Sequence, residues 1–323
     1  MRNVMSLIKY FLSGLVLICT TLFLVFVADI IAKKYLDLGE PIVYDSHALW
    51  GYSPRENRQY KRLDGDIVTI NNVGVRGRDQ WREDGANILF LGDSITYGGS
   101  YVDDSQTFSS LACANLPNWS CHNAGVNFYG IINMVARSRY DSRINDAPIR
   151  IFTFISEDFD RGLQKDDILH FILRDPPSHF SGLWEIMNFI AAMVNPKKWF
   201  GKQSDIQDAE VLREAQLVNR QFALDIFLNE LERLNSLGHS FLIVHSPNIQ
   251  EVEDQNLIDN NFVLSTLSST FPENYISLVD PIRLRFENDR NAIYKDSMHY
   301  EELGHRIASE SITPFISHII NNK

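Results

Sequence analysis

The sequence predicts an α/β domain with a parallel sheet, preceded by one membrane-spanning helix. Short apolar runs rich in β-branched and aromatic residues alternate with amphipathic helical patterns, which is typical of parallel strands joined by crossover helices. One uncharged apolar segment lies near the N-terminus. Of the 323 residues, 45% are hydrophobic and 22% are charged, which indicates a globular chain with insertions rather than disorder.

Residues 1–35 are expected to form a short cytoplasmic tail and a transmembrane anchor. No charge occurs in residues 10–28, and Arg2, Lys9 and the pair at 33–34 flank them. A membrane-spanning helix needs about 20 apolar residues, whereas the apolar region of a cleaved signal peptide has about 7–15. An uncleaved anchor is therefore favoured. The basic residues of the short tail favour a cytoplasmic tail and an external domain.

The globular elements follow in order. Residues 36–86 are expected to be a stalk or lead-in with a short strand, and residues 87–323 the main domain. The first core strand ends at Gly92, and Asp103 can cap the helix that follows. The predicted strands are 67–70, 87–91, 120–123, 149–155, 239–245 and 275–279, and the predicted helices are 103–116, 129–142, 208–237 and 301–320.

A long stretch, about 163–238, separates the third and fourth core strands. Its second half reads as the crossover helix, and its first half, 170–200, is rich in aromatic residues. That first half is either a lid or substrate-facing insertion that touches the membrane surface, or a satellite hydrophobic cluster that covers the sheet. We favour the second interpretation.

Charge and cysteine usage exclude several classes of protein. The net charge of −11, without a basic stripe, argues against nucleic-acid binding. Cys113 and Cys121 either form a disulfide in an oxidising compartment or are two buried small side chains. No Cys-x-x-Cys or clustered histidine spacing accompanies them, so we expect neither a metal nor a cofactor.

A nucleophilic serine with its base is the chemistry that the motifs favour. Ser94 directly follows the first buried core strand, and in an open α/β sheet the carboxyl ends of strands face the ligand crevice. Asp296 and His299 are three residues apart before the last helix, so the carboxylate can orient the imidazole while its other nitrogen reaches the serine. His245 is the reserve base, and His305 is expected on a helix surface.

Three segments resemble the motifs of the SGNH, or GDSL-type, hydrolase family. ILFLGDSITYGG at 88–99 is similar to the first motif, Asn-Ala-Gly at 123–125 to the second, and Asp-Ser-Met-His at 296–299 to the last. The resemblance covers about 87–320, and the INNVGVRG segment at 70–77 is similar to the lead-in of membrane-anchored bacterial members. It implies a flavodoxin-like three-layer α/β/α fold and hydrolysis of acyl esters, often acetyl groups on carbohydrate.

The resemblance also implies roles for individual residues. Ser94 would attack, His299 would be the base, Asp296 would orient it, and the amides of Ser94 and Gly125 would hold the oxyanion. It places the chain in a bacterial inner membrane, with the globular domain in the periplasm.

Glu157 stands where the third motif of the family has an asparagine that donates to the oxyanion. An ionised carboxylate would repel that charge, and loss of one such donor costs about 10²–10³ in rate. Three alternatives stay open: Glu157 is protonated and donates, Ser156 donates instead, or Glu157 turns away to Arg161.

Three functions are consistent with these observations. The leading hypothesis is an esterase that removes O-acetyl groups from a cell-envelope glycan or another acylated molecule. The second is an O-acyltransferase with the same Ser94, His299 and Asp296. The third is a catalytically weak glycan-binding or scaffold domain, for which Glu157 is the main support.

Overall fold

The structure, a computed structural model, describes residues 2–36, 38, 42–61, 66–165, 181–194 and 209–321. The chain divides into two compact units, one formed by Met1–Val43 with Arg174–Gln203 and the other by Tyr44–Leu173 with Ser204–Lys323. Residues from 44 to 86, which we expected to be a stalk, thus belong to the same unit as the predicted hydrolase domain. The prolines and Trp199 of the predicted insertion lie outside the described residues.

The described residues of the first unit form the helices α1 (Arg2–Tyr35) and α5 (Ser181–Val194). From Tyr10 to Tyr35, α1 is long and apolar enough to cross a membrane. The described part of the aromatic first half of the predicted insertion is α5, which packs on α1 within this unit. The physical reason is a cap, because the carboxylate of Asp29 in α1 accepts the Leu183 N–H at the start of α5.

A five-stranded parallel sheet forms the centre of the second unit. Its order is β6-β5-β7-β8-β9, which in chain order is 2-1-3-4-5, the flavodoxin-like arrangement. The predicted α/β class with a parallel sheet is thereby confirmed. The strands are β5 (Asn87–Gly92), β6 (Ser120–Gly125), β7 (Ile149–Phe154), β8 (Ser240–His245) and β9 (Tyr275–Ser277).

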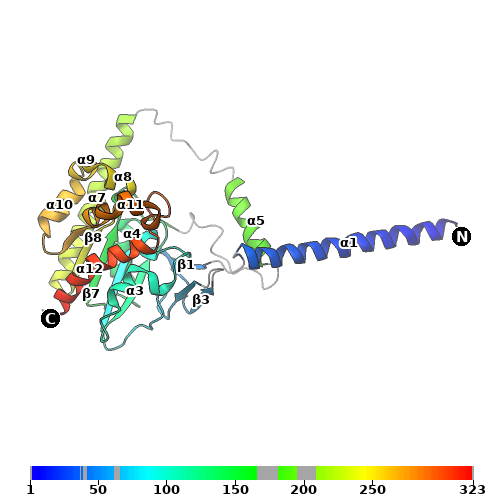
Figure 1. Cartoon of the computed structure of the whole chain (residues 1–323), viewed down its shortest axis with the longest axis horizontal. Helices are drawn as coiled ribbons and strands as arrows, with labels where there is room; N and C mark the ends of the chain where they lie inside the picture. The colour runs from blue at the N-terminus through cyan, green and yellow to red at the C-terminus, as the bar shows by residue number, and fades with distance from the viewer. Residues whose placement is uncertain are drawn as a thin grey trace. The chain divides into compact units, whose positions relative to one another are not determined.

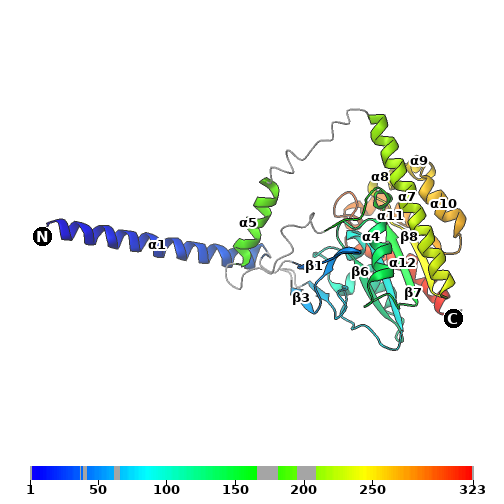
Figure 2. The same ribbon diagram turned by 180° about the vertical axis from the view of Figure 1, so that it is seen from behind.

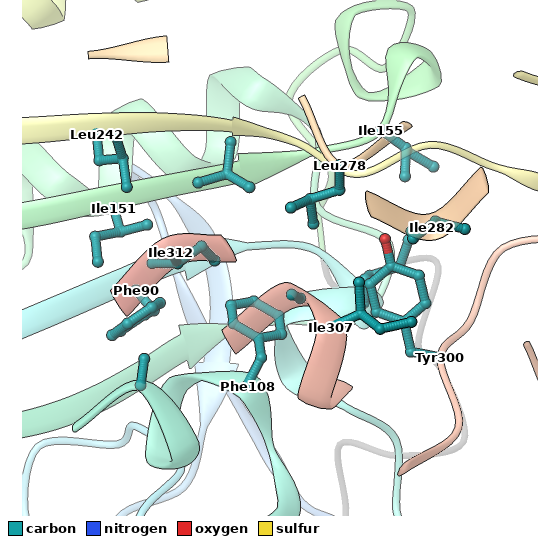
Figure 3. Close-up of a cluster of buried hydrophobic side chains, with 14 of the residues drawn as sticks. Phe90, Phe108, Ile151, Ile155, Leu242, Leu278, Ile282, Tyr300, Ile307 and Ile312 are labelled. Carbon is teal, nitrogen blue, oxygen red and sulfur yellow. The ribbon is translucent and has the colours of Figure 1, made fainter. Parts of the chain in front are cut away.

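Helices cover both faces of this sheet, as Figures 1 and 2 show from opposite sides. Successive strand residues point to opposite faces, so Ile151 and Phe152 of β7 enter different halves of the core. On one face Phe90, Ile151 and Leu242 pack with Phe108, Ile307 and Ile312 (Figure 3). On the other face the Phe152 ring lies 5.1 Å from that of Phe227.

The first face is covered by α3 (Phe108–Cys113), α8 (Ile249–Glu253), α11 (Val279–Ile293) and α12 (Glu302–Asn321). The opposite face carries α4 (Ile131–Tyr140) and α7 (Ala209–Ser236), and the short helices α9 (Gln255–Asp259) and α10 (Phe262–Thr270) follow α8 along the chain. The three helices between β8 and β9 were not predicted, because short segments capped by Asn or Asp lack a long apolar repeat. The longer helix after β9, α11, was not predicted either.

The expected helix at 103–116 is instead a 3₁₀ turn, η1 (Asp104–Gln106), followed by α3. Thr107 has an extended backbone (φ −64°, ψ 144°), and its side chain accepts the Ser110 N–H to cap α3. Cys113 at the end of α3 and Cys121 in β6 form a disulfide with a Cα–Cα distance of 6.0 Å.

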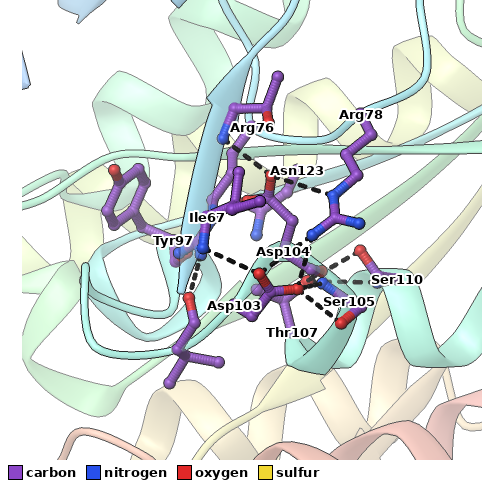
Figure 4. A network of polar contacts seen from close by, with 12 residues as sticks. Ile67, Arg76, Arg78, Tyr97, Asp103, Asp104, Ser105, Thr107, Ser110 and Asn123 are labelled. Carbon is purple, nitrogen blue, oxygen red and sulfur yellow. Dashed lines mark hydrogen bonds and ion pairs between the residues drawn. The ribbon is translucent and has the colours of Figure 1, made fainter. Parts of the chain in front are cut away.

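Two antiparallel hairpins precede the sheet: β1 (Tyr44–His47) with β2 (Gly51–Pro54), and β3 (Arg58–Lys61) with β4 (Ile67–Ile70). Arg76 then enters the interior (Figure 4), where Nε donates to Asp104 Oδ1 at 2.8 Å and Nη1 donates to the carbonyls of Tyr97 and Gly99 at 2.6 Å. The guanidinium therefore ties the lead-in to the loop that follows the predicted nucleophile.

Candidate active site

Ser94 begins a one-turn helix, α2 (Ser94–Tyr97), at the carboxyl end of β5. The side chain of Asp93 caps this helix by accepting the Ile95 N–H at 2.9 Å. Gly92 is required at the strand exit, because a Cβ there would lie 1.9 Å from Thr96 Oγ1. The local sequence thus turns the chain sharply and leaves Ser94 half-buried at the end of the sheet where the parallel strands have their carboxyl termini.

His299 meets Ser94 although 205 residues separate them. Ser94 Oγ lies 2.8 Å from His299 Nε2, and His299 Nδ1 lies 2.7 Å from Asp296 Oδ2. The other oxygen of Asp296 accepts the backbone N–H groups of Met298 and His299, each at 2.9 Å. The three predicted residues therefore form one hydrogen-bonded chain.

The surroundings of Asp296 favour its ionised form. Partial burial raises the pKa of this carboxyl, but the N–H groups of His299 and Met298 together with the His299 ring outweigh it and hold the pKa below its usual value. A carboxylate at Nδ1 keeps the ring proton there, so Nε2 can accept a proton from Ser94.

Gly125, the predicted oxyanion donor, ends β6 beside the serine helix. A Cβ at this position would lie 2.3 Å from the backbone nitrogen of Tyr97 and 2.7 Å from Thr96 C. Its N–H donates to Asn123 Oδ1 at 2.9 Å, and Asn123 Nδ2 donates to the Thr96 carbonyl at 2.5 Å. An oxyanion would therefore compete with Asn123 for the Gly125 amide.

Glu157 lies in η2 (Ser156–Phe159), directly after β7. Its Oε1 accepts a hydrogen bond from Asn248 Nδ2 at 2.9 Å, and its Oε2 is buried without a hydrogen-bond partner in the described part of the chain. Ser156 Oγ donates to Glu251, whereas Arg161 Nη1 donates to Asp158 Oδ1 at 2.6 Å. Of the three alternatives left open for Glu157, the turn toward Arg161 is not the arrangement in the structure, where Glu157 contacts Asn248 and Arg161 contacts the buried Asp158.

A buried group of charges, which the sequence did not single out, lies beneath the serine helix. Arg161 Nη1 is 3.6 Å from Asp93 Oδ2 and also binds Asp158. Burial raises the pKa of Asp93, and burial together with the neighbouring Asp93 raises that of Asp158 well above its usual value. The Asp-x-x-Arg spacing at 158–161 was the one available signal for this group.

Two other histidines occupy structural positions. His245 is buried, with Nε2 3.5 Å from Glu251 Oε2. His305 was expected on a helix surface, and this expectation is wrong because α12 packs on α3 there. Its Nδ1 accepts the Phe108 N–H at 3.3 Å, and burial with nearby Arg76 lowers its pKa to about 3. No cluster of three or more His, Cys, Asp or Glu that could hold a metal occurs among the described residues.

Comparisons with known proteins give remote structural likenesses. No family model and no curated protein matches the sequence. A lipolytic protein of the G-D-S-L family from Veillonella parvula is 15% identical, with a TM-score of 0.39, over 70% of this chain and 95% of that one. An acetylxylan esterase mutant from Geobacillus stearothermophilus is 14% identical, with a TM-score of 0.42, over 72% and 94%.

A two-domain esterase active on acetylated mannans is 15% identical, with a TM-score of 0.43, over 72% of this chain and 50% of that one. The fold assignment therefore depends on strand order, and the chemistry depends on the contacts of Ser94 and His299.

Proposed function

We propose that this protein is a membrane-anchored serine esterase of the SGNH type that removes acyl groups, chiefly O-acetyl groups, from a cell-envelope glycan. The observation that supports catalysis is the contact of Ser94 Oγ with His299 Nε2 at 2.8 Å, with Asp296 behind the ring at 2.7 Å. The glycan substrate rests on the motif resemblance together with the membrane anchor.

The proposed reaction has two steps. Ser94 Oγ attacks the acyl carbonyl carbon while His299 Nε2 takes the hydroxyl proton, and the carbonyl oxygen becomes an oxyanion. The Ser94 and Gly125 amides stabilise that charge. The sugar oxygen leaves with the proton from His299, and an acyl-serine remains. Water then gives a proton to His299 and attacks the acyl carbon. The bond to Ser94 Oγ breaks, Oγ takes the proton from His299, and the carboxylic acid is released.

The disulfide supports the proposed location of the catalytic unit. Bonds such as Cys113–Cys121 persist in oxidising compartments and are rare in the cytosol. We therefore place the unit that carries Ser94 on the periplasmic side of a bacterial inner membrane, with α1 as the single-pass anchor and the basic tail in the cytoplasm.

Active-site labelling of the full-length protein in detergent tests the proposal. A fluorophosphonate with a small substituent, comparable in size to an acetyl ester, should modify Ser94, and peptide mapping should locate the adduct on this residue. Ser94→Ala should lose both labelling and hydrolysis of an activated acetyl ester. Ser268→Ala is the matched control, because its hydroxyl makes a solvent-exposed hydrogen bond to the Ser265 carbonyl at 3.2 Å within α10. Undiminished hydrolysis by Ser94→Ala would remove this residue from the mechanism.

A further inference from the structure

The helix α5 carries very few charges. Among its fourteen residues, SGLWEIMNFIAAMV, Glu185 is the one ionisable side chain. Met187 is 70% exposed and Ile190 is 52% exposed. Both side chains lie on one side of the helix, because residues three apart are neighbours on a helical surface. These two neighbouring side chains give α5 an exposed apolar side, which is the kind of surface that an interfacial helix presents to lipid.

The start of α5 is attached to the last turns of α1. Asp29 Oδ1 accepts the Leu183 N–H at 3.0 Å, and Asp29 Oδ2 is paired with Lys33 Nζ at 2.8 Å. The two backbones approach closely, since a Cβ on Gly182 would lie 3.0 Å from the Ala32 Cβ. The beginning of α5 therefore lies at the same depth in the membrane as Asp29.

The length of the uncharged run in α1 sets this depth. Residues 10–28 carry no charge and, at 1.5 Å per residue, span about 28 Å, close to the roughly 30 Å hydrocarbon core. Asp29 then lies at the edge of the hydrocarbon, and Lys33, Lys34 and Tyr35 lie among the headgroups, where basic and aromatic residues are enriched.

We propose that α5 is an interfacial helix that lies in the boundary between headgroups and acyl chains, with Met187 and Ile190 toward the lipid tails. This inference rests on the proposed anchor α1 and is independent of the esterase chemistry. The bilayer is the occupant of the exposed face, because the helix starts at the level where the membrane-spanning run ends and has almost no charge to keep it in water. A second contact of this kind would strengthen membrane attachment beyond that of α1 alone.

Depth-dependent quenching in liposomes tests the position of α5. The full chain with Cys19→Ser would carry Met187→Cys or Ile190→Cys, labelled with an environment-sensitive fluorophore. Lipids with a nitroxide just below the headgroup should quench both sites at least about twofold, and more than lipids with a nitroxide at the chain end. Leu284→Cys, at an 84% exposed position of α11, is the matched control and should not be quenched.

The results at Cys19 test the anchor α1, and the results at 187 and 190 test the interfacial position of α5. The wild-type Cys19, in the middle of α1, should be quenched by the deep nitroxide. Quenching at Cys19 without quenching at 187 and 190 would mean that α5 faces water or protein, and would overturn the proposal. Stronger quenching of 187 and 190 by the deep nitroxide would also overturn it, because α5 would then be buried in the core. An unquenched Cys19 would overturn the anchor and the interfacial helix together, while Ser94 labelling would be unaffected.

Discussion

Replacement of Asp296 by asparagine should lower kcat more than replacement by alanine, although asparagine is the closer match in shape. Asp296 Oδ1 accepts two backbone N–H groups at 2.9 Å, and Oδ2 faces His299 Nδ1 at 2.7 Å. In Asp296→Asn the amide oxygen should keep the two N–H groups, so the amide NH₂ must face Nδ1. The ring of His299 then carries its proton on Nε2, so Nε2 can no longer accept the hydroxyl proton of Ser94.

The contacts set the size of this effect. The reversed amide would give up two backbone hydrogen bonds, each worth about 1 kcal/mol net, and would set donor against donor. A cost of about 2–3 kcal/mol leaves at most about one molecule in thirty with the productive tautomer. The variant also loses the carboxylate that stabilises the imidazolium, and this loss lowers kcat further. The corresponding change in Ser–His–Asp enzymes lowers kcat about 10⁴-fold. Because the Asp296 side chain is 51% exposed, we expect about 10³-fold for Asp296→Asn.

Alanine leaves the tautomer free to change, so Asp296→Ala should lose only about 10²-fold. The assay is hydrolysis of an activated acetyl ester by the full chain in detergent, with kcat and KM measured separately. Asp280→Asn is the matched control, since it makes the same change on an 87% exposed side chain. The reasoning is refuted if Asp296→Asn keeps more than about a tenth of the wild-type kcat, or if it is the more active of the two variants.

Four further changes test other parts of the site and fold. Gly125→Ala should lower kcat by at least about 10²-fold, because its Cβ would lie 2.3 Å from a nitrogen of the serine helix; unchanged kinetics would contradict the packing. Glu157→Asn should raise kcat by about tenfold or more, because it supplies an amide NH₂ that can donate to the oxyanion; a fall in kcat would show that the carboxyl itself is needed. Arg76→Met should reduce the free energy of unfolding by about 3–5 kcal/mol, measured by denaturant titration, because it removes the 2.8 Å ion pair of the buried Asp104 and the donor to the carbonyls of Tyr97 and Gly99; a loss below about 1 kcal/mol would contradict this. Burial lowers the pKa of His122 to about 4, and burial with nearby Arg76 lowers that of His305 to about 3, so the unfolded chain binds protons first as pH falls below about 6.5. The free energy of unfolding should therefore rise between pH 4 and pH 6.5 by about 1.4 kcal/mol per pH unit for each of the two rings. His305→Gln should reduce this slope, and an unaltered slope would contradict the assignment of His305 as a buried neutral ring.

Local sequence was sufficient for the strands and for one half of the candidate site. Runs such as 87–91 and 149–155 are buried on both faces of the sheet, so their composition alone indicates strands. Asp296 and His299 are three residues apart on one loop, and their contact depends on little beyond the backbone of that loop. The helix at 103–116 was wrong because an extended Thr107 interrupts it, and nothing in the apolar pattern signals that break.

The sequence by itself determined the α/β class, the apolar N-terminal helix and the position of Ser94 after its strand, since each depends on residues close together in the chain. Only the tertiary structure decided that Glu157 contacts Asn248, that Arg161 lies between two buried carboxyls, and that His305 is inside. These outcomes depend on which distant segments pack together, and their free energies come from burial and charge pairing that no local pattern of residues records.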